Sequence, residues 1–437
     1  MDSIAVEYGV SVDSVIYNNQ LVYPYRLAVG QALLLSSGNA GETVTSGADT
    51  GETDTSETDI SETDTSEADT SGAGISGAGT SGANTSEADI GGDAGSEADS
   101  HSGSDSDRKE AVPLIHTGGY AYPFISPWVL EQTLPYLSEL SIFSYGFTNE
   151  GEPVPPMLEE QWMIDAAAER RVMPTLTLTP IGEDGRFSDN LTHILVSDLS
   201  VQQNLSRRLL QIMLEKGYRG LNLDFEYVMA QDRLVYAQFV GNITRIMNWF
   251  GIPVSVALAP KYSDHQEGEL YEGMDYGLLG AAANSVFLMT YEWGYTYGPP
   301  MAVAPIHLVR RVVEYALTRI PASKISLGMP NYGYDWALPY ERGITKAKTI
   351  GNVEAVQLAI EQGVEIQFDE EAQSPYFRYW KYGVQHEVWF QDVRSSRAAF
   401  DLIKEFDLRG GGYWQLMQLF RANWLLLADT FEIEKMI

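Results

Sequence analysis

Short apolar runs alternate with amphipathic segments over most of the chain after residue 111. Eight of these runs are rich in aliphatic, aromatic or β-branched residues and are short enough to be strands. They lie at 112–117, 140–145, 172–179, 220–226, 253–260, 285–292, 324–330 and 410–416. Between most of them apolar residues recur at helical spacing, as Leu205, Leu209 and Met213 do before the fourth run. Eight alternating strand and helix units predict an α/β fold, a (β/α)8 TIM barrel.

The segment from 111 to 437 is longer than the roughly 250 residues of a typical barrel of this class. The surplus lies between the seventh and eighth runs, from about 332 to 392. It contains further strand-like runs at 364–368, 377–382 and 387–390. We therefore expect a small α+β insertion beside the cleft of a catalytic barrel.

Residues 1–37 have the pattern of a small separate unit. The apolar residues before Gly9 indicate the end of a helix, and Ser11 is the expected N-cap of a second helix. The apolar run at 27–35 indicates a strand that closes the unit. A unit of this size is below the roughly 40 residues at which domains usually fold without further support.

Residues 38–110 consist mainly of small polar and acidic residues, and most of the segment is a five-residue repeat of the type SETDT or SEADT. Such a composition cannot bury enough apolar surface to offset the entropy of ordering the chain. The segment is predicted to be a disordered acidic linker. A calcium-binding repeat is the alternative, but no EF-hand order of ligands is present.

Composition excludes several classes of function. The net charge of −32 disfavours binding to nucleic acid or to anionic lipid. The chain has no cysteine, and its six histidines are scattered, so neither a thiolate site nor a metal site is expected. No apolar run is as long as a membrane span, and no signal peptide is visible. We expect the protein to be made in the cytoplasm. If it acts at a cell wall, we expect it to arrive there by a route other than a signal peptide.

The candidate chemistry centres on the run Gly220–Tyr227. Strand alternation places Asn222, Asp224 and Glu226 on one face and the apolar residues on the other. A half-exposed antiparallel strand with its acids in water has the same pattern. The predicted barrel favours the functional interpretation, because carboxylates at the C-terminal end of a barrel strand face the catalytic cleft.

Two other predicted strands end in residues suited to binding a sugar. The sixth ends in Met289, Tyr291 and Glu292, and the eighth carries Trp414 near its end. An indole ring stacks on the apolar face of a pyranose while polar groups fix the hydroxyls. These residues and the carboxylates on the fourth strand together indicate a glycan site.

The segment from 111 to 437 resembles glycoside hydrolase family 18. The fourth-strand signature of that family is Asp-x-x-Asp-x-Asp-x-Glu, whose last two positions match Asp224 and Glu226. Its Met-x-Tyr-Asp motif on the sixth strand resembles 289–292, and its floor tryptophan matches Trp414. The first two aspartates of the signature fall on Arg219 and Asn222, Glu292 replaces an aspartate, and 177–180 replaces Ser-x-Gly-Gly.

Asn222, with the residues around Glu226, resembles the branch of bacterial spore peptidoglycan glycosidases that carry N-terminal LysM modules. Residues 1–37 themselves resemble a truncated LysM module, a peptidoglycan- and chitin-binding domain that here lacks its first strand. The matching residues are Ile4, Ala5, Tyr8 to Ser11, Val15, Ile16, Asn18, Asn19, Leu27 and Val29 to Gln31.

The resemblance implies a retaining, substrate-assisted mechanism without a cofactor. Glu226 would be the general acid and base, and Asp224 would orient the acetamido group of the substrate. Tyr291 would donate to the acetamide oxygen, Trp414 would form the floor of the site, and Asn222 would hold Asp224 through a hydrogen bond. Glu292, Met289, Tyr120 and Tyr145 are further candidates for substrate binding.

The leading hypothesis is therefore hydrolysis of β-1,4 N-acetylglucosaminyl bonds in peptidoglycan, in spore cortex or its fragments during germination. The expected partner is a glycan containing N-acetylglucosamine, and the enzyme is expected to be a monomer associated with the spore or cell wall. A chitinase is the alternative enzyme. A lectin-like barrel that binds glycans without cleaving them is the non-enzymatic alternative.

Overall fold

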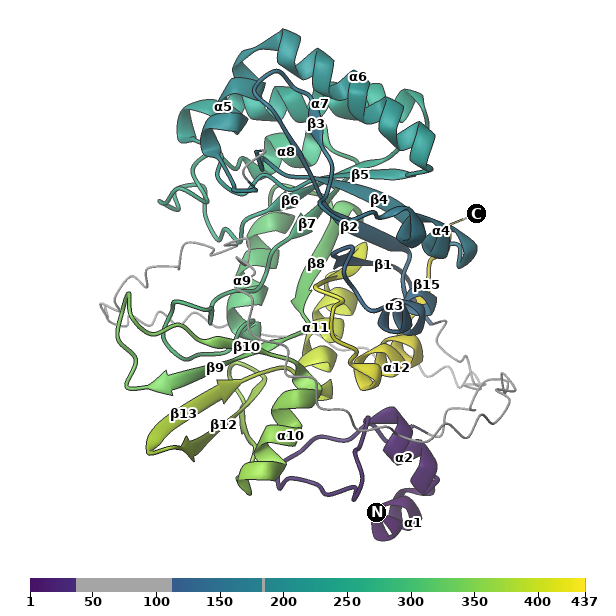
Figure 1. Ribbon diagram of the computed structural model, residues 1–437, viewed down its shortest axis with the longest axis vertical. Helices are drawn as coiled ribbons and strands as arrows, with labels where there is room; N and C mark the ends of the chain where they lie inside the picture. The colour runs from purple at the N-terminus through teal and green to yellow at the C-terminus, as the bar shows by residue number, and fades with distance from the viewer. Residues whose placement is uncertain (37–111, 183–184, 437) are drawn as a thin grey trace, which may run out of the picture.

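The computed structural model describes residues 1–36, 112–182 and 185–436 (Figure 1), so the predicted linker lies outside the described residues. Eight parallel strands form a barrel, and β1 pairs with both β2 and β14, which closes it. The barrel strands are β1 (Leu114–Ala121), β2 (Glu139–Phe147), β4 (Met173–Leu178), β5 (Gly220–Leu223), β6 (Val254–Leu258), β7 (Ser285–Leu288), β8 (Ile325–Pro330) and β14 (Gly410–Trp414). The predicted (β/α)8 barrel is confirmed.

Several barrel strands end earlier than the apolar pattern predicted, and the difference is largest for β5 and β7. β5 ends at Leu223, where its pairing with β4 and β6 stops, and β7 ends at Leu288. Asp224 and the motif at 289–292 therefore lie on the segments that directly follow the strands. The apolar pattern extends further because these segments remain buried after the ladder of hydrogen bonds has ended.

Helices cover the outside of the barrel. Their buried residues pack against the outward faces of the strands and form the main apolar core, as Leu209 of α6 and Phe239 of α7 do. Asp198 is the N-cap of α6, and its side chain accepts from the amide of Ser200; Gly217, in the left-handed conformation, caps the other end. The layer contains α3 (Pro127–Thr133), α4 (Gln161–Glu169), α5 (Asp189–Ser197), α6 (Leu199–Lys216), α7 (Arg233–Trp249), α8 (Tyr276–Ala282), α9 (Ile306–Leu317), α11 (Val393–Glu405) and α12 (Arg421–Thr430).

Between β8 and α11 the chain forms a five-stranded antiparallel sheet in the order β10-β9-β13-β12-β11. α10 (Asn352–Gln362) packs on this sheet through Ala355 and Ala359, which contact a core that includes Phe377. Its strands are β9 (Gly333–Leu338), β10 (Lys348–Ile350), β11 (Gln367–Asp369), β12 (Ser374–Lys381) and β13 (Val384–Trp389). Two short strands, β3 (Pro153–Val154) and β15 (Glu432–Ile433), flank the barrel sheet.

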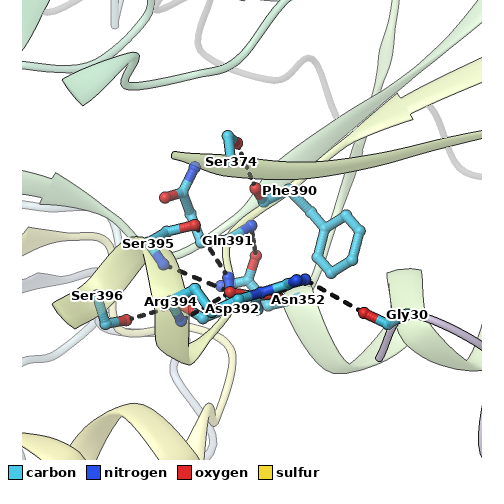
Figure 2. Close-up of polar contacts among 9 residues, drawn as sticks. All are labelled: Gly30, Asn352, Ser374, Phe390, Gln391, Asp392, Arg394, Ser395 and Ser396. Carbon is cyan, nitrogen blue, oxygen red and sulfur yellow. Dashed lines mark hydrogen bonds and ion pairs between the residues drawn. The ribbon is translucent and has the colours of Figure 1, made fainter. Parts of the chain in front are cut away.

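The chain returns from the insertion to the barrel through a network of hydrogen bonds (Figure 2). Asp392 caps α11 by accepting from the amides of Arg394 and Ser395. The guanidinium of Arg394 contacts the same carboxylate at 2.7 Å and also donates to the carbonyl of Gly30 at 3.2 Å. This junction therefore joins the insertion, the barrel and the N-terminal unit.

The N-terminal unit contains α1 (Asp2–Tyr8) and α2 (Val12–Asn18). Gly9 ends α1 in the left-handed conformation, and the hydroxyl of Ser11 caps α2, as predicted. The predicted strand at 27–35 is wrong, because the described residues offer it no neighbouring strand with which to pair. The side chain of Asn19 bonds instead to both the amide and the carbonyl of Leu34, at 2.7 and 3.0 Å.

The N-terminal unit lies against the barrel and the insertion, beside α10 and α12 (Figure 1). The amide of Ile366 donates to the carbonyl of Val29 at 2.9 Å, and the amide of Arg421 donates to the side chain of Gln20 at 2.6 Å. Leu34 is part of the main apolar core. The unit is thus packed onto the barrel and the insertion in this structure.

Candidate active site

The candidate site lies at the C-terminal ends of the barrel strands. The apolar residues of 220–226 join the core outside the barrel, and Asn222 and Asp224 face its interior, as alternation predicted. Asn222 and Asp224 are almost fully buried, and Glu226 is half-buried. Asn222, Asp224 and Glu226 therefore form a row of polar side chains that ends in the partly accessible carboxyl group of Glu226.

Asn222 is held by residues of two other barrel strands, β1 across the interior and the adjacent β6. Its Oδ1 accepts from the hydroxyl of Tyr120 at 3.2 Å, and its Nδ2 donates to the hydroxyl of Ser255 at 2.9 Å. The expected hydrogen bond from Asn222 to Asp224 is not found, because the amide is turned toward these two hydroxyls. The Oδ1 atom of Asp224 is buried without a hydrogen-bond partner among the described residues.

Burial dominates the electrostatics of the carboxyl pair. It raises the pKa of Asp224 and of Glu226 well above their ordinary values, and the nearby charges of Asp224 and Glu292 raise that of Glu226 further. Within the described part of the chain, no arginine, lysine or histidine forms an ion pair with these carboxyl groups. The pair therefore retains a proton to higher pH than solvated carboxyl groups would.

Glu292 approaches the pair from the segment after β7. Its backbone has a φ of 67°, and its carboxylate accepts from the hydroxyls of Tyr332 and Tyr334. Burial raises the pKa of Glu292 to about 7, and the two phenol hydrogen bonds oppose this rise. Glu292 is thus a third carboxyl group that changes its charge near neutral pH.

Tyr291 lies beside the same carboxyl groups. Tyr291 is buried, and burial together with the nearby Tyr120, Asp224 and Glu226 raises the pKa of its hydroxyl, which remains protonated. Met289 packs on the aromatic cluster that contains Tyr291. Tyr291 can therefore donate a hydrogen bond to an acceptor on a substrate.

Trp414 is partly exposed at the end of β14. Three aromatic rings surround it, with centroids 5.6 Å away for Tyr120, 6.1 Å for Tyr122 and 5.1 Å for Phe143. All three lie at steep angles to the indole plane, which fixes the ring from its edges and faces. An indole held in this way beside carboxyl groups is suited to stacking on a sugar.

Comparison with known proteins identifies the family. Glycosyl hydrolases family 18 matches residues 170–418, which is more than half of the chain. The chain belongs to glycosyl hydrolase family 18. It is therefore a glycoside hydrolase, and the expected enzyme class and fold are both confirmed.

Relatives in this family include two Bacillus enzymes. The chain is 43% identical over 302 residues to the cortical fragment-lytic enzyme of Bacillus subtilis strain 168, a match that covers 69% of each chain. The crystal structure of the spore cortex-lytic enzyme SleL of Bacillus cereus superposes with a TM-score of 0.80 at 28% identity, over 99% of this chain and 96% of that one. A chitinase from Chromobacterium violaceum, at 22% identity and a TM-score of 0.67, shares the fold over 72% of this chain and 98% of its own.

One residue that the sequence assigned to substrate binding, Tyr145, lies outside the cleft. Tyr145 points into the helix layer, where its hydroxyl donates to Glu160 at 2.7 Å and its ring packs on Tyr218. A register shift between Ile142 and Tyr145 in the pairing of β2 with β4 breaks the alternation. Tyr145 therefore does not line the cleft, and the sequence-based assignment is wrong.

Two aromatic residues of the family 18 cleft were not predicted. Tyr122 follows Tyr120 by two residues, and the alternation of β1 could have indicated it, since both rings contact Trp414. Phe143 lies just before the register shift in β2, two residues before Tyr145, so the alternation that assigned Tyr145 to the cleft could also have indicated Phe143. Among the described residues, no group of three or more histidine, aspartate or glutamate side chains could hold a metal ion, and no helix is long and apolar enough to span a membrane.

Proposed function

We propose that this enzyme hydrolyses β-1,4 N-acetylglucosaminyl bonds in fragments of spore cortex peptidoglycan. The family assignment gives the reaction class, and the names of two relatives, a cortical fragment-lytic enzyme and a spore cortex-lytic enzyme, support cortex fragments as the substrate. It also implies association with the spore. The single observation that supports it is the convergence of Asp224, Glu226, Tyr291 and Trp414 at one end of the barrel.

In the first step, Glu226 donates its proton to the glycosidic oxygen while the acetamide oxygen of the substrate attacks the anomeric carbon. The carbon–oxygen bond to the leaving sugar breaks, and a cyclic oxazolinium intermediate forms. Asp224 holds the acetamide nitrogen and stabilises the positive charge, and Tyr291 donates to the acetamide oxygen. The raised pKa of Glu226 suits it to carry this proton near neutral pH.

In the second step, water attacks the anomeric carbon and Glu226, now a carboxylate, accepts its proton. The ring of the intermediate opens and the acetamide is restored, so the product retains the configuration of the substrate. Trp414 stacks beneath the reacting sugar in both steps. The three aromatic side chains around the indole fix its orientation before the substrate binds.

The proposal is tested by incubating the wild type and Glu226→Gln with three substrates: cortex fragments that contain muramic lactam, vegetative peptidoglycan and chitin oligomers. New reducing ends and product masses are measured. We expect cleavage of cortex fragments, reduced at least about 10²-fold in the variant. Faster cleavage of chitin oligomers would identify a chitinase instead, and binding without cleavage by the wild type would identify a lectin.

A further inference from the structure

Glu292 is held from the insertion side of the cleft by two neighbouring tyrosines. The hydroxyl of Tyr334 donates to its carboxylate, with distances of 2.9 Å to Oε1 and 3.1 Å to Oε2, and the hydroxyl of Tyr332 donates to Oε1. The two rings pack edge to face, with centroids 5.5 Å apart, and both are buried. The carboxylate therefore has a fixed position.

The chain positions this clamp at the start of the insertion. Tyr332 follows β8 and Tyr334 lies in β9, whose other face carries Asp335. Glu292 itself has a left-handed backbone, which turns its side chain away from the path of the strand. The first residues of the insertion, Tyr332 before its sheet and Tyr334 within it, thus supply both donors to a carboxyl group of the barrel.

We propose that Tyr332 and Tyr334 are positioning residues that hold Glu292 beside Glu226 and favour its ionised form, so that the insertion sets the pH range over which the general acid keeps its proton. The inference rests on the proposed role of Glu226. Asp224 and Tyr122 face Glu226. Tyr332 and Tyr334 face Glu292, and Tyr291 faces both glutamates.

The direction of the effect follows from the charges. An ionised Glu292 raises the pKa of Glu226, and the phenol hydrogen bonds favour the ionised form of Glu292. When a phenol hydroxyl is removed, Glu292 stays protonated to higher pH and its charge no longer supports the proton on Glu226. Glu226 then loses its proton at lower pH than in the wild type.

Tyr334→Phe and Tyr332→Phe test the inference through the pH profile of kcat/KM. We expect the alkaline limb of the profile to move to lower pH by roughly half a unit in each variant. Tyr379→Phe is the matched control, because its hydroxyl donates to Asp335 at 2.6 Å on the other face of the sheet. The control should leave the alkaline limb in place.

A double-mutant comparison separates positioning from a merely structural role. Glu292→Gln alone should also move the alkaline limb to lower pH, and adding Tyr334→Phe to it should cause no further shift. An unmoved limb in both tyrosine variants would overturn the inference. So would an equal shift in Tyr379→Phe, or a second shift in the Glu292→Gln background.

A measurement without substrate makes the outcome independent of the proposed function. Carboxyl carbons of glutamate are labelled with ¹³C, and the signal of Glu292 is assigned by its loss in Glu292→Gln. Its titration midpoint should rise in Tyr334→Phe and stay unchanged in Tyr379→Phe. An unchanged midpoint in Tyr334→Phe would refute the clamp whatever substrate the enzyme cleaves, whereas a raised midpoint in an enzyme inactive on cortex fragments would refute only the proposed function.

Discussion

The two ends of the barrel interior both hold buried carboxyl groups, but the residues around these groups differ. Near the N-terminal end, Glu139 lies 3.4 Å from the imidazole of His116 and accepts from Ser141 at 3.1 Å, and the charge of Arg409 acts on it. At the C-terminal end, Asp224 and Glu226 have no basic partner among the described residues. The fold therefore compensates one carboxyl group and leaves a pair of others uncompensated.

Burial raises the pKa of the carboxyl group at both ends, so burial alone does not mark the catalytic end. At the N-terminal end Arg409 opposes the rise, and it also helps to lower the pKa of His116. At the other end the neighbours of Glu226 are carboxyl groups, which add to the rise. An acid that keeps its proton near neutral pH requires the second arrangement.

The largest expected difference between the two ends is in activity. Glu226→Gln should lose about 10²- to 10⁴-fold in kcat, because it removes the proposed proton donor. Glu139→Gln should stay within a few-fold of the wild type, since Glu139 lies at the other end of the barrel. Steady-state rates on one soluble glycan fragment decide this. A loss in Glu139→Gln as large as that in Glu226→Gln would show that the N-terminal end of the barrel interior takes part in catalysis.

Stability should change in the opposite sense. The folded-state pKa of Glu226 is raised above the unfolded value of about 4.3, so its contribution is complete below that pH and is lost as pH rises through the folded pKa. Glu226→Gln should therefore unfold at a higher urea concentration than the wild type at pH 8. Burial raises the pKa of Glu139 as well, but Arg409 opposes that rise, so Glu139→Gln should raise the urea midpoint at pH 8 less than Glu226→Gln does.

Trp414 gives the next largest effect and tests the open, aromatic side of the catalytic end. Trp414→Ala should reduce kcat/KM roughly 10- to 100-fold, because it removes the stacking surface and leaves the surrounding rings without their central contact. Trp380→Ala is the control, since Trp380 is 65% exposed on β12 of the insertion. Equal losses in both variants would show that Trp414 is not the floor of the site.

The sequence predicted the barrel well because its signal is repeated. Each of eight strands carries an apolar run, and alternation on the fourth strand placed Asn222 and Asp224 toward the interior. Contacts between distant strands were less predictable. The bond from Tyr120 to Asn222 joins residues 102 positions apart, and nothing local indicates that the amide turns away from Asp224. The strand at 27–35 failed because a strand requires a partner that the local pattern cannot supply.

Asn222→Asp should sharpen the contrast between the ends by adding one more carboxyl group without a basic partner beside Asp224. Its site is buried, and Asp224 follows two residues later, just after the end of β5, so the folded-state pKa of the introduced carboxyl should lie above the unfolded value of about 3.9. The loss of stability should be small near pH 4 and reach about 1–3 kcal/mol as pH rises through the folded pKa. Urea unfolding at pH 4.5 and pH 8 measures this. Equal stability of variant and wild type at pH 8 would mean that the hydroxyls of Tyr120 and Ser255 fully solvate the new charge.

The smallest expected effect on activity distinguishes two tyrosines that looked alike in the sequence. The hydroxyl of Tyr120 donates to Asn222 inside the barrel, and that of Tyr145 donates to Glu160 in the helix layer, where Lys216 also contacts Glu160 at 2.8 Å. Tyr145→Phe should therefore lower stability by about 0.5–1.5 kcal/mol and leave kcat/KM within about two-fold of the wild type. Tyr120→Phe should lower kcat/KM more, since it frees the amide beside Asp224. If Tyr145→Phe impaired catalysis as much as Tyr120→Phe at equal stability, the outward turn of β2 at its register shift would not separate Tyr145 from the cleft.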